Sequence, residues 1–263
     1  MLAALLITLD LLVVAHRGAS AVAPENTMAA FRAAGTAGAD MYELDVRQTK
    51  DGQLVVVHDS TLARTTDVER LYPDRAPWRV SDFTLAEIKQ LDAGSWFGAG
   101  FTGQRVPTVR EAIAASSDGP GLVLEVKNPT KAMDAPLTQL LDELPSDTIV
   151  LSYDWAFLRR LQTHAQRATL GPVSLARLPS VAAFADLVVV RHNSISVPFV
   201  RRAHKLGIKV ISTTVDRPAV MRRMLASGVD GMLTNRPRVA RNVADMKPEF
   251  DELRNVIGDM LGR

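Results

Sequence analysis

The chain has 263 residues, 47% of them hydrophobic, a length that suits one large domain or two small ones. It contains no cysteine, which excludes disulfides, thiolate metal sites and a catalytic cysteine. Its 31 basic and 29 acidic residues leave a net charge of +2 with no basic stripe interleaved with aromatic residues, so we expect no nucleic-acid partner.

The first fifteen residues, MLAALLITLDLLVVA, are mostly apolar, but Thr8 and Asp10 interrupt them. They lack a basic leading region and a small-residue cleavage site, and they are shorter than the roughly 20 residues of a membrane span. We expect a short lead-in, a first strand at Leu11–Ala15 and a cytoplasmic location. The alternative is a membrane segment or anchor, with a membrane-associated or extracytoplasmic protein.

Short runs rich in β-branched residues alternate with helical patterns along most of the chain. The predicted strands are Leu11–Ala15, Met41–Val46, Leu122–Val126, Thr148–Leu151, Ala168–Leu170, Leu187–Val190, Lys209–Ser212 and Gly231–Leu233. The clearest helices between them are Asn26–Ala34, Val109–Ala115, Pro136–Leu144, Trp155–Gln162, Val197–Leu206 and Arg217–Ala226, and a final polar helix is expected from Met246. This alternation predicts an α/β fold, a (β/α)8 barrel that forms one domain over residues 1–263. A doubly wound sheet is the rival, but its Gly-rich turn after the first strand is absent here.

Two features interrupt the alternation. The turn Lys50–Gln53 contains Asp-Gly, a strong hairpin signal, so QLVVVHD is expected to be an added strand that ends on His58 and Asp59. Residues 60–105 are long for a connection within a barrel, and we expect a small inserted subdomain over one end of it. Within this insertion Leu85–Leu91 is helical, and Thr84 with Glu87 forms a predicted capping box.

Ionisable residues gather where the first three parallel strands end. They are His16, Arg17, Glu43, Asp45, Glu125 and Lys127. Because side chains alternate along a strand, Glu43 and Asp45 share one face of MYELDV, as do Glu125 and Lys127 of LVLEVKN. In a barrel the inward face at the carboxyl ends of the strands is where active sites form, so we expect all of them at one mouth.

This set of residues suggests metal-assisted cleavage of a phosphate ester. Three neighbouring carboxylates repel one another unless they bind a hard cation such as Mg²⁺ or Ca²⁺. An arginine and a lysine are suited to a phosphate group, and two histidines are suited to acid–base catalysis near neutral pH. Taken singly, each element also has a structural explanation, as a turn, an edge strand, a salt bridge or the end of a hairpin.

The series as a whole resembles the glycerophosphodiester phosphodiesterase family. It consists of His16-Arg17-Gly18, Pro24-Glu25-Asn26-Thr27, Glu43-x-Asp45, His58-Asp59 and Glu125-x-Lys127, with LDAGSWF, VPTVREA and DGMLTNRP further along. The order and the spacing are both similar, and the resemblance extends over roughly residues 11–240.

The resemblance implies a (β/α)8 barrel that hydrolyses glycerophosphodiesters to glycerol 3-phosphate and an alcohol with a divalent cation, Mg²⁺ or Ca²⁺. The roles it implies are metal ligation by Glu43, Asp45 and Glu125, acid–base catalysis by His16 and His58, phosphate binding by Arg17 and Lys127, and a supporting role for Glu25. The alternatives are a lysophospholipase D-like activity on lysophospholipids and a non-catalytic barrel that binds phosphorylated ligands.

The chain departs from the resemblance after the seventh barrel strand, where many members have a Trp-Thr-Val-Asn run. Here Thr213 stands in place of the tryptophan and Asp216 in place of the asparagine, which leaves a smaller and more polar wall. His192 follows a strand and is a candidate for substrate contact. Other candidates are expected to be surface or packing residues, namely His164, His204, Trp78, Trp96, Phe97 and Phe101.

Overall fold

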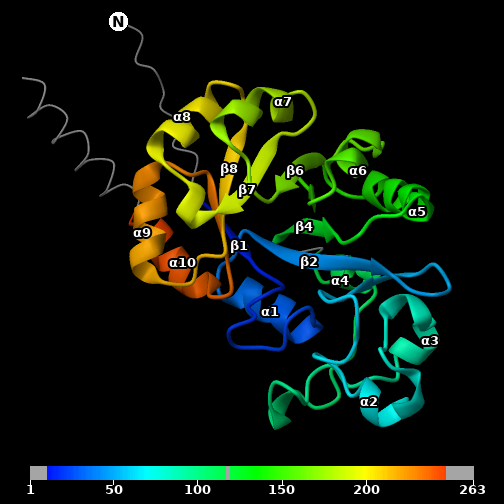
Figure 1. Ribbon diagram of the computed structural model, residues 1–263. Coiled ribbons are helices and arrows are strands. Elements are labelled where there is room, and N and C mark those ends of the chain that lie inside the picture. Colours follow the sequence, from blue (N-terminus) through cyan, green and yellow to red (C-terminus); the bar gives the residue numbers. More distant parts are fainter. Residues whose placement is uncertain (1–10, 117–118, 247–263) are drawn as a thin grey trace, which may run out of the picture.

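Eight parallel strands close into a barrel in the computed structural model, which describes residues 11–116 and 119–246 (Figure 1). They are β1 (Leu12–Ala15), β2 (Met41–Gln48), β4 (Gly121–Val126), β5 (Ile149–Ser152), β6 (Gln166–Leu170), β7 (Leu187–Arg191), β8 (Lys209–Thr213) and β9 (Gly231–Thr234). Their order is β1-β9-β8-β7-β6-β5-β4-β2, and pairing of β1 with β2 closes the ring. All eight predicted strands are confirmed, and their ends differ from the prediction by one or two residues.

Helices surround the barrel. They are α1 (Met28–Thr36), α4 (Val109–Ala114), α5 (Lys131–Asp142), α6 (Trp155–Arg160), α7 (Leu178–Ala182), α8 (Val197–His204), α9 (Pro218–Ser227) and α10 (Pro237–Ala244), with 3-10 turns at η4 (Leu175–Arg177) and η5 (His192–Ser194). The six predicted helices are confirmed, although α5 begins five residues early and contains Pro136. The sequence pattern missed α7, which is short, and α10, whose buried stripe consists mainly of alanine and valine. The helix predicted from Met246 lies almost entirely outside the described residues.

The barrel interior changes from apolar to charged along the strands. Near the amino ends the inward side chains form an apolar cluster that includes Val14, Met41, Val123 and Leu187. Because every second residue points inward, the next inward positions of β2 are Glu43 and Asp45. The pattern of alternation therefore delivers carboxylates to the carboxyl end of the barrel.

The predicted hairpin and added strand are present, but the strand ends at Val56 and not at His58 and Asp59. Gly52 adopts a φ of +81°, and β3 (Leu54–Val56) runs antiparallel to β2 on its outer side, with Val46 opposite Val56. This strand lies outside the closed ring and leads directly to His58, so His58 reaches the mouth from beyond the barrel wall.

The insertion has its own small apolar core beside the hairpin (Figure 1). Its short helices are α2 (Val68–Leu71), η1 (Pro73–Arg75), η2 (Val80–Asp82), α3 (Leu85–Ile88) and η3 (Ala99–Phe101). The capping box at the start of α3 is confirmed, since Thr84 N–H donates to Glu87 Oε2 at 2.8 Å and the Thr84 hydroxyl accepts from Glu87 N–H. The predicted end at Leu91 was wrong, because the chain turns after Ile88 to bury Leu91 in this core.

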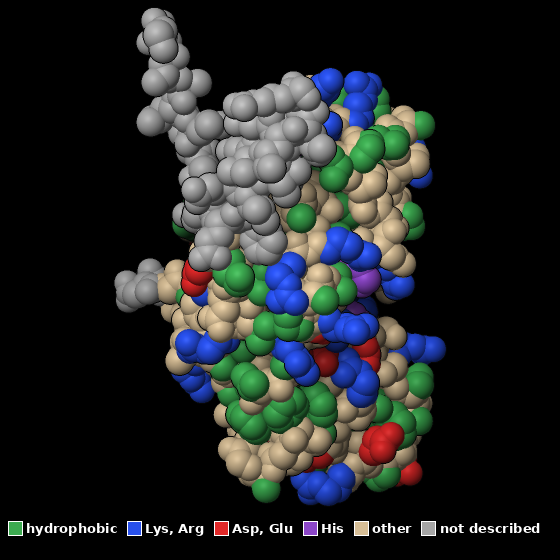
Figure 2. All heavy atoms as spheres, turned by 90° about the vertical axis from the view of Figure 1, so that its left-hand side faces the viewer, with side chains coloured by type: hydrophobic (Ala, Val, Ile, Leu, Met, Phe, Trp, Pro, Cys, Tyr) green, Lys and Arg blue, Asp and Glu red, His purple; other side chains and the backbone are tan. Residues whose placement is uncertain are grey.

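The surface adds two observations. On the face in Figure 2, Lys and Arg side chains are spread among hydrophobic and other side chains rather than gathered into one stripe. Within residues 11–116 and 119–246, no helix combines the length and the apolar character needed to cross a membrane.

Gly18 fixes the loop between β1 and α1, and its replacement by alanine should be strongly destabilising. Its φ is +79°, and a Cβ there would lie 2.6 Å from the backbone carbon of Ala30. We expect Gly18→Ala to lower the free energy of unfolding by about 2–4 kcal/mol, from left-handed backbone strain plus overpacking. Urea denaturation measures this loss. Gly98→Ala is the control, since its Cβ meets open space, and equal stability of the two variants would contradict the prediction.

Candidate active site

A cavity of about 720 Å³ opens at the carboxyl ends of the barrel strands. Five of the predicted site residues line it, namely His16, Arg17, His58, Glu125 and Lys127. Its remaining lining comes mainly from β5 to β9 and includes Tyr153, Arg191, His192 and Thr213. The residues that the sequence placed at one mouth are therefore brought together, as the barrel prediction requires.

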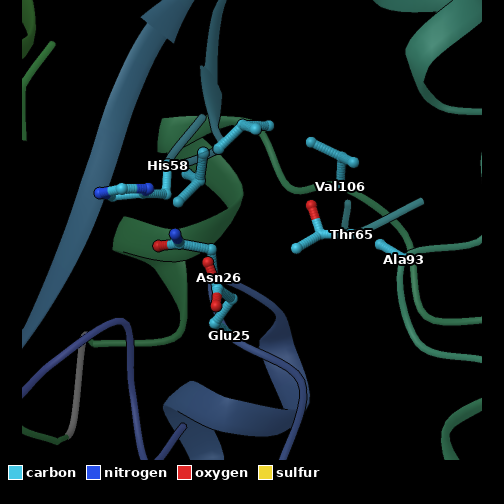
Figure 3. A pocket seen from close by; sticks show the side chains of 8 residues that line it. Glu25, Asn26, His58, Thr65, Ala93 and Val106 are labelled. Atoms are coloured by element: carbon cyan, nitrogen blue, oxygen red, sulfur yellow. The ribbon is translucent and has the colours of Figure 1, made fainter. Parts of the chain in front are cut away.

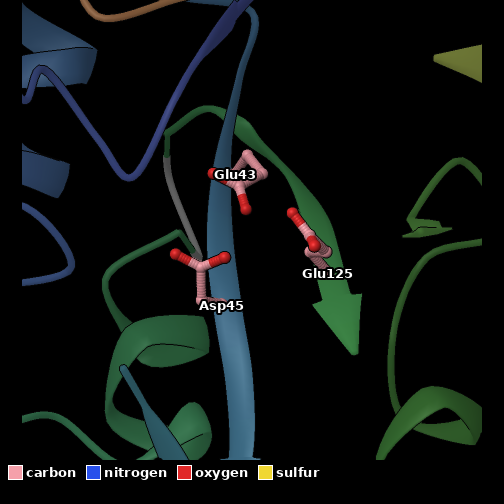
Figure 4. Close-up of side chains that lie close together, drawn as sticks. All are labelled: Glu43, Asp45 and Glu125. Carbon is pink, nitrogen blue, oxygen red and sulfur yellow. The ribbon is translucent and has the colours of Figure 1, made fainter. Parts of the chain in front are cut away.

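Glu43, Asp45 and Glu125 form a buried acidic cluster between two neighbouring strands (Figure 4). Glu43 and Asp45 come from β2, and Glu125 lies directly beside Asp45 in the parallel register of β4. One carboxylate oxygen from each lies within 4.8 Å of the other two. Exposures of 0%, 0% and 4% show that these charges are buried away from bulk solvent.

Burial and mutual repulsion shift the acidic cluster away from ordinary carboxylate behaviour. Burial, with Asp45 and Glu125 nearby, raises the pKa of Glu43 well above its usual value. Burial and Asp45 likewise raise the pKa of Glu125. Burial also opposes the charge on Asp45, but Lys127 and Arg17 hold the pKa of Asp45 below its usual value. The cluster thus contains more acidic groups than its own cations can neutralise.

The acidic cluster fits a hard divalent cation. Glu43 Oε2 accepts a hydrogen bond from the Arg17 backbone N–H at 2.8 Å, whereas the buried Glu43 Oε1 has no hydrogen-bond partner. An unpartnered buried carboxylate oxygen is costly unless a further group binds it. An all-oxygen donor set is what hard divalent cations prefer. These three carboxylates can therefore hold such an ion.

Arg17 and Lys127 lie at the edge of the acidic cluster. Arg17 Nη1 donates to Glu25 Oε1 at 2.9 Å, and its Nε lies 3.3 Å from Asp45 Oδ2. Lys127 Nζ lies 3.0 Å from Asp45 Oδ1 and also donates to Glu125. Although burial opposes both charges, the surrounding carboxylates raise the pKa of Arg17 and of Lys127. Both side chains are therefore fixed cations at the cavity wall.

His16 is oriented by a neutral amide. Its Nδ1 lies 2.7 Å from Asn235 Oδ1, and Asn235 Nδ2 donates to Asp216 Oδ2 at 2.6 Å. Since the amide oxygen is an acceptor, Nδ1 must bear a proton, which leaves Nε2 of the neutral ring as an acceptor. Burial and the charge on Arg17 lower the pKa of His16 to about 4.

His58 is oriented by a carboxylate. Its Nδ1 lies 2.6 Å from Asp59 Oδ1, and Arg47 donates to the His58 carbonyl at 2.7 and 3.0 Å. Burial lowers the pKa of His58, while Asp45 and Asp59 act in the opposite direction. The two histidines thus differ in the charge of the group that holds them.

Arg64 links the two sides of the site, and the sequence pattern missed it. It donates to both Glu25 oxygens, at 2.7 and 2.9 Å, and its Nε donates to Asp59 Oδ2 at 2.6 Å. A chain of ion pairs therefore runs from Arg17 through Glu25, Arg64 and Asp59 to His58. The sequence signal was a pair of carboxylates near the mouth, Glu25 and Asp59, the second of which follows a histidine. Such a pair indicates a nearby arginine whose guanidinium group binds both.

Asn26 and Asn235 were also missed as site residues. Asn26 Nδ2 donates to Asp45 Oδ2 at 2.7 Å, and its φ of +58° belongs to a conformation that asparagine adopts more readily than most residues. Asn235 lies in DGMLTNRP, which contributed to the resemblance without a stated role. Its contact with His16 joins residues 219 positions apart.

The insertion packs directly behind His58. A small cavity of about 10 Å³ lies between Glu25, Asn26 and His58 on one side and insertion residues on the other (Figure 3). The insertion residues are Thr65 and Ala93, with Val106 just beyond the insertion. The hairpin end that bears His58 is therefore supported by packing as well as by ion pairs.

The remaining candidates lie in two kinds of place, at the cavity or away from it. His192 and Thr213 line the cavity, and Arg223 Nη2 lies 3.2 Å from His192 Nδ1. His164 contacts the Leu144 carbonyl at 2.9 Å and His204 contacts Asp230 at 2.8 Å, and neither lines the cavity. The aromatic residues of the insertion pack locally, with Trp96 and Phe101 each against Phe97 and the Trp78 indole donating to the Tyr72 carbonyl.

Comparison with known proteins gives a consistent result. Residues 16–239 match the model of the glycerophosphoryl diester phosphodiesterase family. A glycerophosphodiester phosphodiesterase from Caldanaerobacter subterraneus is 38% identical over 243 residues, which are 88% of this chain and 97% of the relative. The crystal structure of an Agrobacterium tumefaciens glycerophosphodiester phosphodiesterase has a TM-score of 0.74 and 32% identity, covering 88% of this chain and 98% of that one. An Oleispira antarctica phosphodiesterase in complex with the product sn-glycerol-3-phosphate has a TM-score of 0.80 and 28% identity, covering 90% and 97%.

Proposed function

Because this chain belongs to the glycerophosphoryl diester phosphodiesterase family, we propose that it releases sn-glycerol 3-phosphate and an alcohol from glycerophosphodiesters in a cation-dependent reaction. It is an enzyme, a glycerophosphodiester phosphodiesterase with a (β/α)8 barrel. The observation that supports the cation dependence is the buried acidic cluster, with its unpartnered Glu43 oxygen, beside two fixed cations. The product found in the Oleispira antarctica relative supports the same choice of substrate.

In this proposal Glu43, Asp45 and Glu125 hold a single Mg²⁺ or Ca²⁺ ion. When bound, the ion supplies positive charge to the phosphoryl oxygens, on which negative charge increases in the transition state. Arg17 and Lys127 would bind the phosphoryl oxygens, and Glu25 keeps Arg17 in place through their 2.9 Å contact. Fixed cations need no reorganisation during the reaction, which is the source of their catalytic effect.

We assign the base to His16 and the acid to His58 from the groups that hold them. His16 Nε2 takes the proton of the attacking oxygen as a new P–O bond forms. Attack by water gives glycerol 3-phosphate directly, whereas attack by the neighbouring glycerol hydroxyl gives a cyclic phosphate that water then opens. The P–O bond to the alcohol breaks, and His58 Nε2 gives a proton to the departing oxygen. A carboxylate beside His58 stabilises its protonated ring, whereas His16 contacts only a neutral amide at Nδ1, and burial with the charge on Arg17 favours its neutral ring.

The alternative activities have weaker support. A lysophospholipid substrate calls for an apolar cleft, but the aromatic residues of the insertion do not line the cavity. A binding-only barrel is disfavoured because both histidines and all three carboxylates are present. The single-domain organisation over residues 1–263, the cytoplasmic location and the lack of a nucleic-acid partner stay predictions from the sequence.

The test is the release of glycerol 3-phosphate by the purified protein from glycerophosphocholine and glycerophosphoethanolamine. We expect release with Mg²⁺ or Ca²⁺ and none with excess chelator, and restoration when the metal is returned. Equal rates with and without chelator would contradict the cation dependence. Lysophospholipids serve as the comparison, and their preferred cleavage would favour the alternative activity.

A further inference from the structure

The cavity wall at the end of β7 contains a cation, Arg191, that the proposed reaction does not use. Arg191 is the last residue of β7, and it follows Val189, which lines the same cavity, by two positions, so both side chains share the inward face. In the parallel register Arg191 lies beside Thr213 of β8. Arg191 is exposed.

Arg191 differs from the other cations of the mouth in having no partner. Arg17 and Lys127 each contact carboxylates, as described above. Within residues 11–116 and 119–246, the Arg191 guanidinium makes no hydrogen bond or ion pair. Among the described lining residues, the single acidic side chain is Glu125, which belongs to the acidic cluster and contacts Lys127. The charge on Arg191 is therefore available to a ligand.

The position of Arg191 identifies the part of a substrate that it would meet. The ring order β1-β9-β8-β7-β6-β5-β4-β2 puts β7 four strands from β2 in either direction, so Arg191 lies across the barrel from Glu43 and Asp45. A phosphoryl group held at the acidic cluster has two ester substituents, and the one that extends across the cavity meets this opposite wall. We call Arg191–Ser194 and Thr213 the far wall.

The rest of the far wall consists of hydrogen-bonding groups without negative charge. Arg223 Nη2 lies 3.2 Å from His192 Nδ1, so this nitrogen is the acceptor of the neutral ring and His192 Nε2 bears the proton. Asn193 and Ser194 add an amide and a hydroxyl to the lining. A quaternary ammonium group prefers a cage of Trp, Tyr or Phe rings or a carboxylate, but the lining that the structure describes offers one such ring, Tyr153, which is 62% exposed.

We propose that the far wall binds an anionic group on the leaving alcohol, with Arg191 as its specificity-determining residue. The enzyme then prefers glycerophosphodiesters whose alcohol bears a carboxylate or a phosphate over those whose alcohol ends in a cation. This proposal rests on the proposed function, since it specifies the substrate class of the same site. Glycerol is common to all these substrates, so the preference is a property of the alcohol alone.

Two matched substrate pairs test the proposal. Glycerophosphoserine differs from glycerophosphoethanolamine by one carboxylate, and glycerophosphoinositol 4-phosphate differs from glycerophosphoinositol by one phosphate. We expect kcat/KM to be about threefold to fivefold higher for the anionic member of at least one pair, the size expected for an exposed charge contact. The pair that shows the larger ratio identifies the preferred anion, and both ratios should fall as salt is added.

Variants then assign the preference to Arg191. Arg191→Gln should bring the ratio within the affected pair close to one, and Arg191→Lys should restore part of it. Arg222→Gln is the matched control, because Arg222 is exposed on α9 and does not line the cavity, so this variant should keep the full ratio.

The outcomes separate the two proposals. Ratios of one for the unaltered enzyme, or an equal loss for all four substrates in Arg191→Gln, would overturn the far-wall proposal and leave the proposed function standing. The equal loss would indicate contact with glycerol instead. If none of the four diesters is cleaved with Mg²⁺ or Ca²⁺, the proposed function fails and the far-wall proposal fails with it.

Discussion

Glu43→Gln should abolish turnover while leaving the cation-free protein at least as stable as the unaltered one. The two effects have opposite signs because the Glu43 carboxylate is needed to bind the cation but destabilises the cation-free protein. Glu43 is fully buried next to two other carboxyl groups, so its ionised form is costly, and glutamine removes that charge with little change of shape. Most destabilising substitutions also reduce activity, so a variant that is inactive but undiminished in stability is a specific expectation.

The pH dependence of the cation-free protein follows from the direction of the shift. The pKa of Glu43 is raised above its ordinary value of 4.5 in the folded state. The stability associated with this group is therefore fully present below pH 4.5 and is lost as the pH rises through the higher folded pKa. We expect Glu43→Gln to remove this loss. The stability of the variant relative to the unaltered protein should therefore increase as the pH rises from acid to neutral.

Thermal unfolding in chelator, then with added Mg²⁺ or Ca²⁺, measures both effects. The unaltered protein should gain stability with the cation, because a ligand that binds the folded state raises its melting temperature, and Glu43→Gln should gain much less. Glu69→Gln, at an exposed position outside the acidic cluster, should behave like the unaltered protein. A full cation-induced gain in Glu43→Gln would remove this glutamate from the ligand set.

His58→Ala should lower kcat on natural glycerophosphodiesters by about 10²–10⁴, the usual contribution of a positioned proton donor. The loss should be far smaller on a glycerol 3-phosphate ester of p-nitrophenol, because this leaving group departs without a proton. His16→Ala should lose activity on both substrates, since a base is required whichever group departs. The contrast between the two substrates therefore tests which histidine is the acid and which is the base.

Steady-state kinetics on both substrates checks these roles, with melting temperatures to show that each variant folds. His164→Ala is the control, because His164 lies outside the cavity and contacts the Leu144 carbonyl and Asp142 instead. Equal losses in His58→Ala on both substrates would contradict its assignment as the acid. Loss confined to the natural substrate in His16→Ala would indicate that the two roles are exchanged.

The fold was predictable because its signals are local. Each strand is a short buried run, and strict alternation on β2 predicted that Glu43 and Asp45 would share a face. Helix ends were less predictable, since α5 begins before Pro136 and α10 is buried through small residues that give a weak apolar pattern. These errors changed helix boundaries and left the barrel assignment intact.

The site was predictable in its ionisable residues and not in the groups that position them. The ionisable residues were predictable because the alternation of side chains along a strand, and the point where the strand ends, show which residues point into the mouth. The positioning groups depend on side-chain directions in loops, as in the contact of Arg64 with Glu25 across 39 residues and that of Asn235 with His16 across 219. No pattern of spacing encodes such meetings, so a three-dimensional structure was needed to find them.

The location of β3 outside the closed ring has a consequence for how such an enzyme can change. The acidic cluster, Lys127 and His16 belong to the ring. His58 instead follows the added hairpin, which the insertion supports. In the proposed reaction, the groups that bind the phosphoryl oxygens and the proton donor to the leaving alcohol therefore come from separate pieces of chain. Remodelling of the insertion should therefore alter the final proton transfer first, and Arg64, which lies in the insertion, would pass the change on to Glu25 and Arg17.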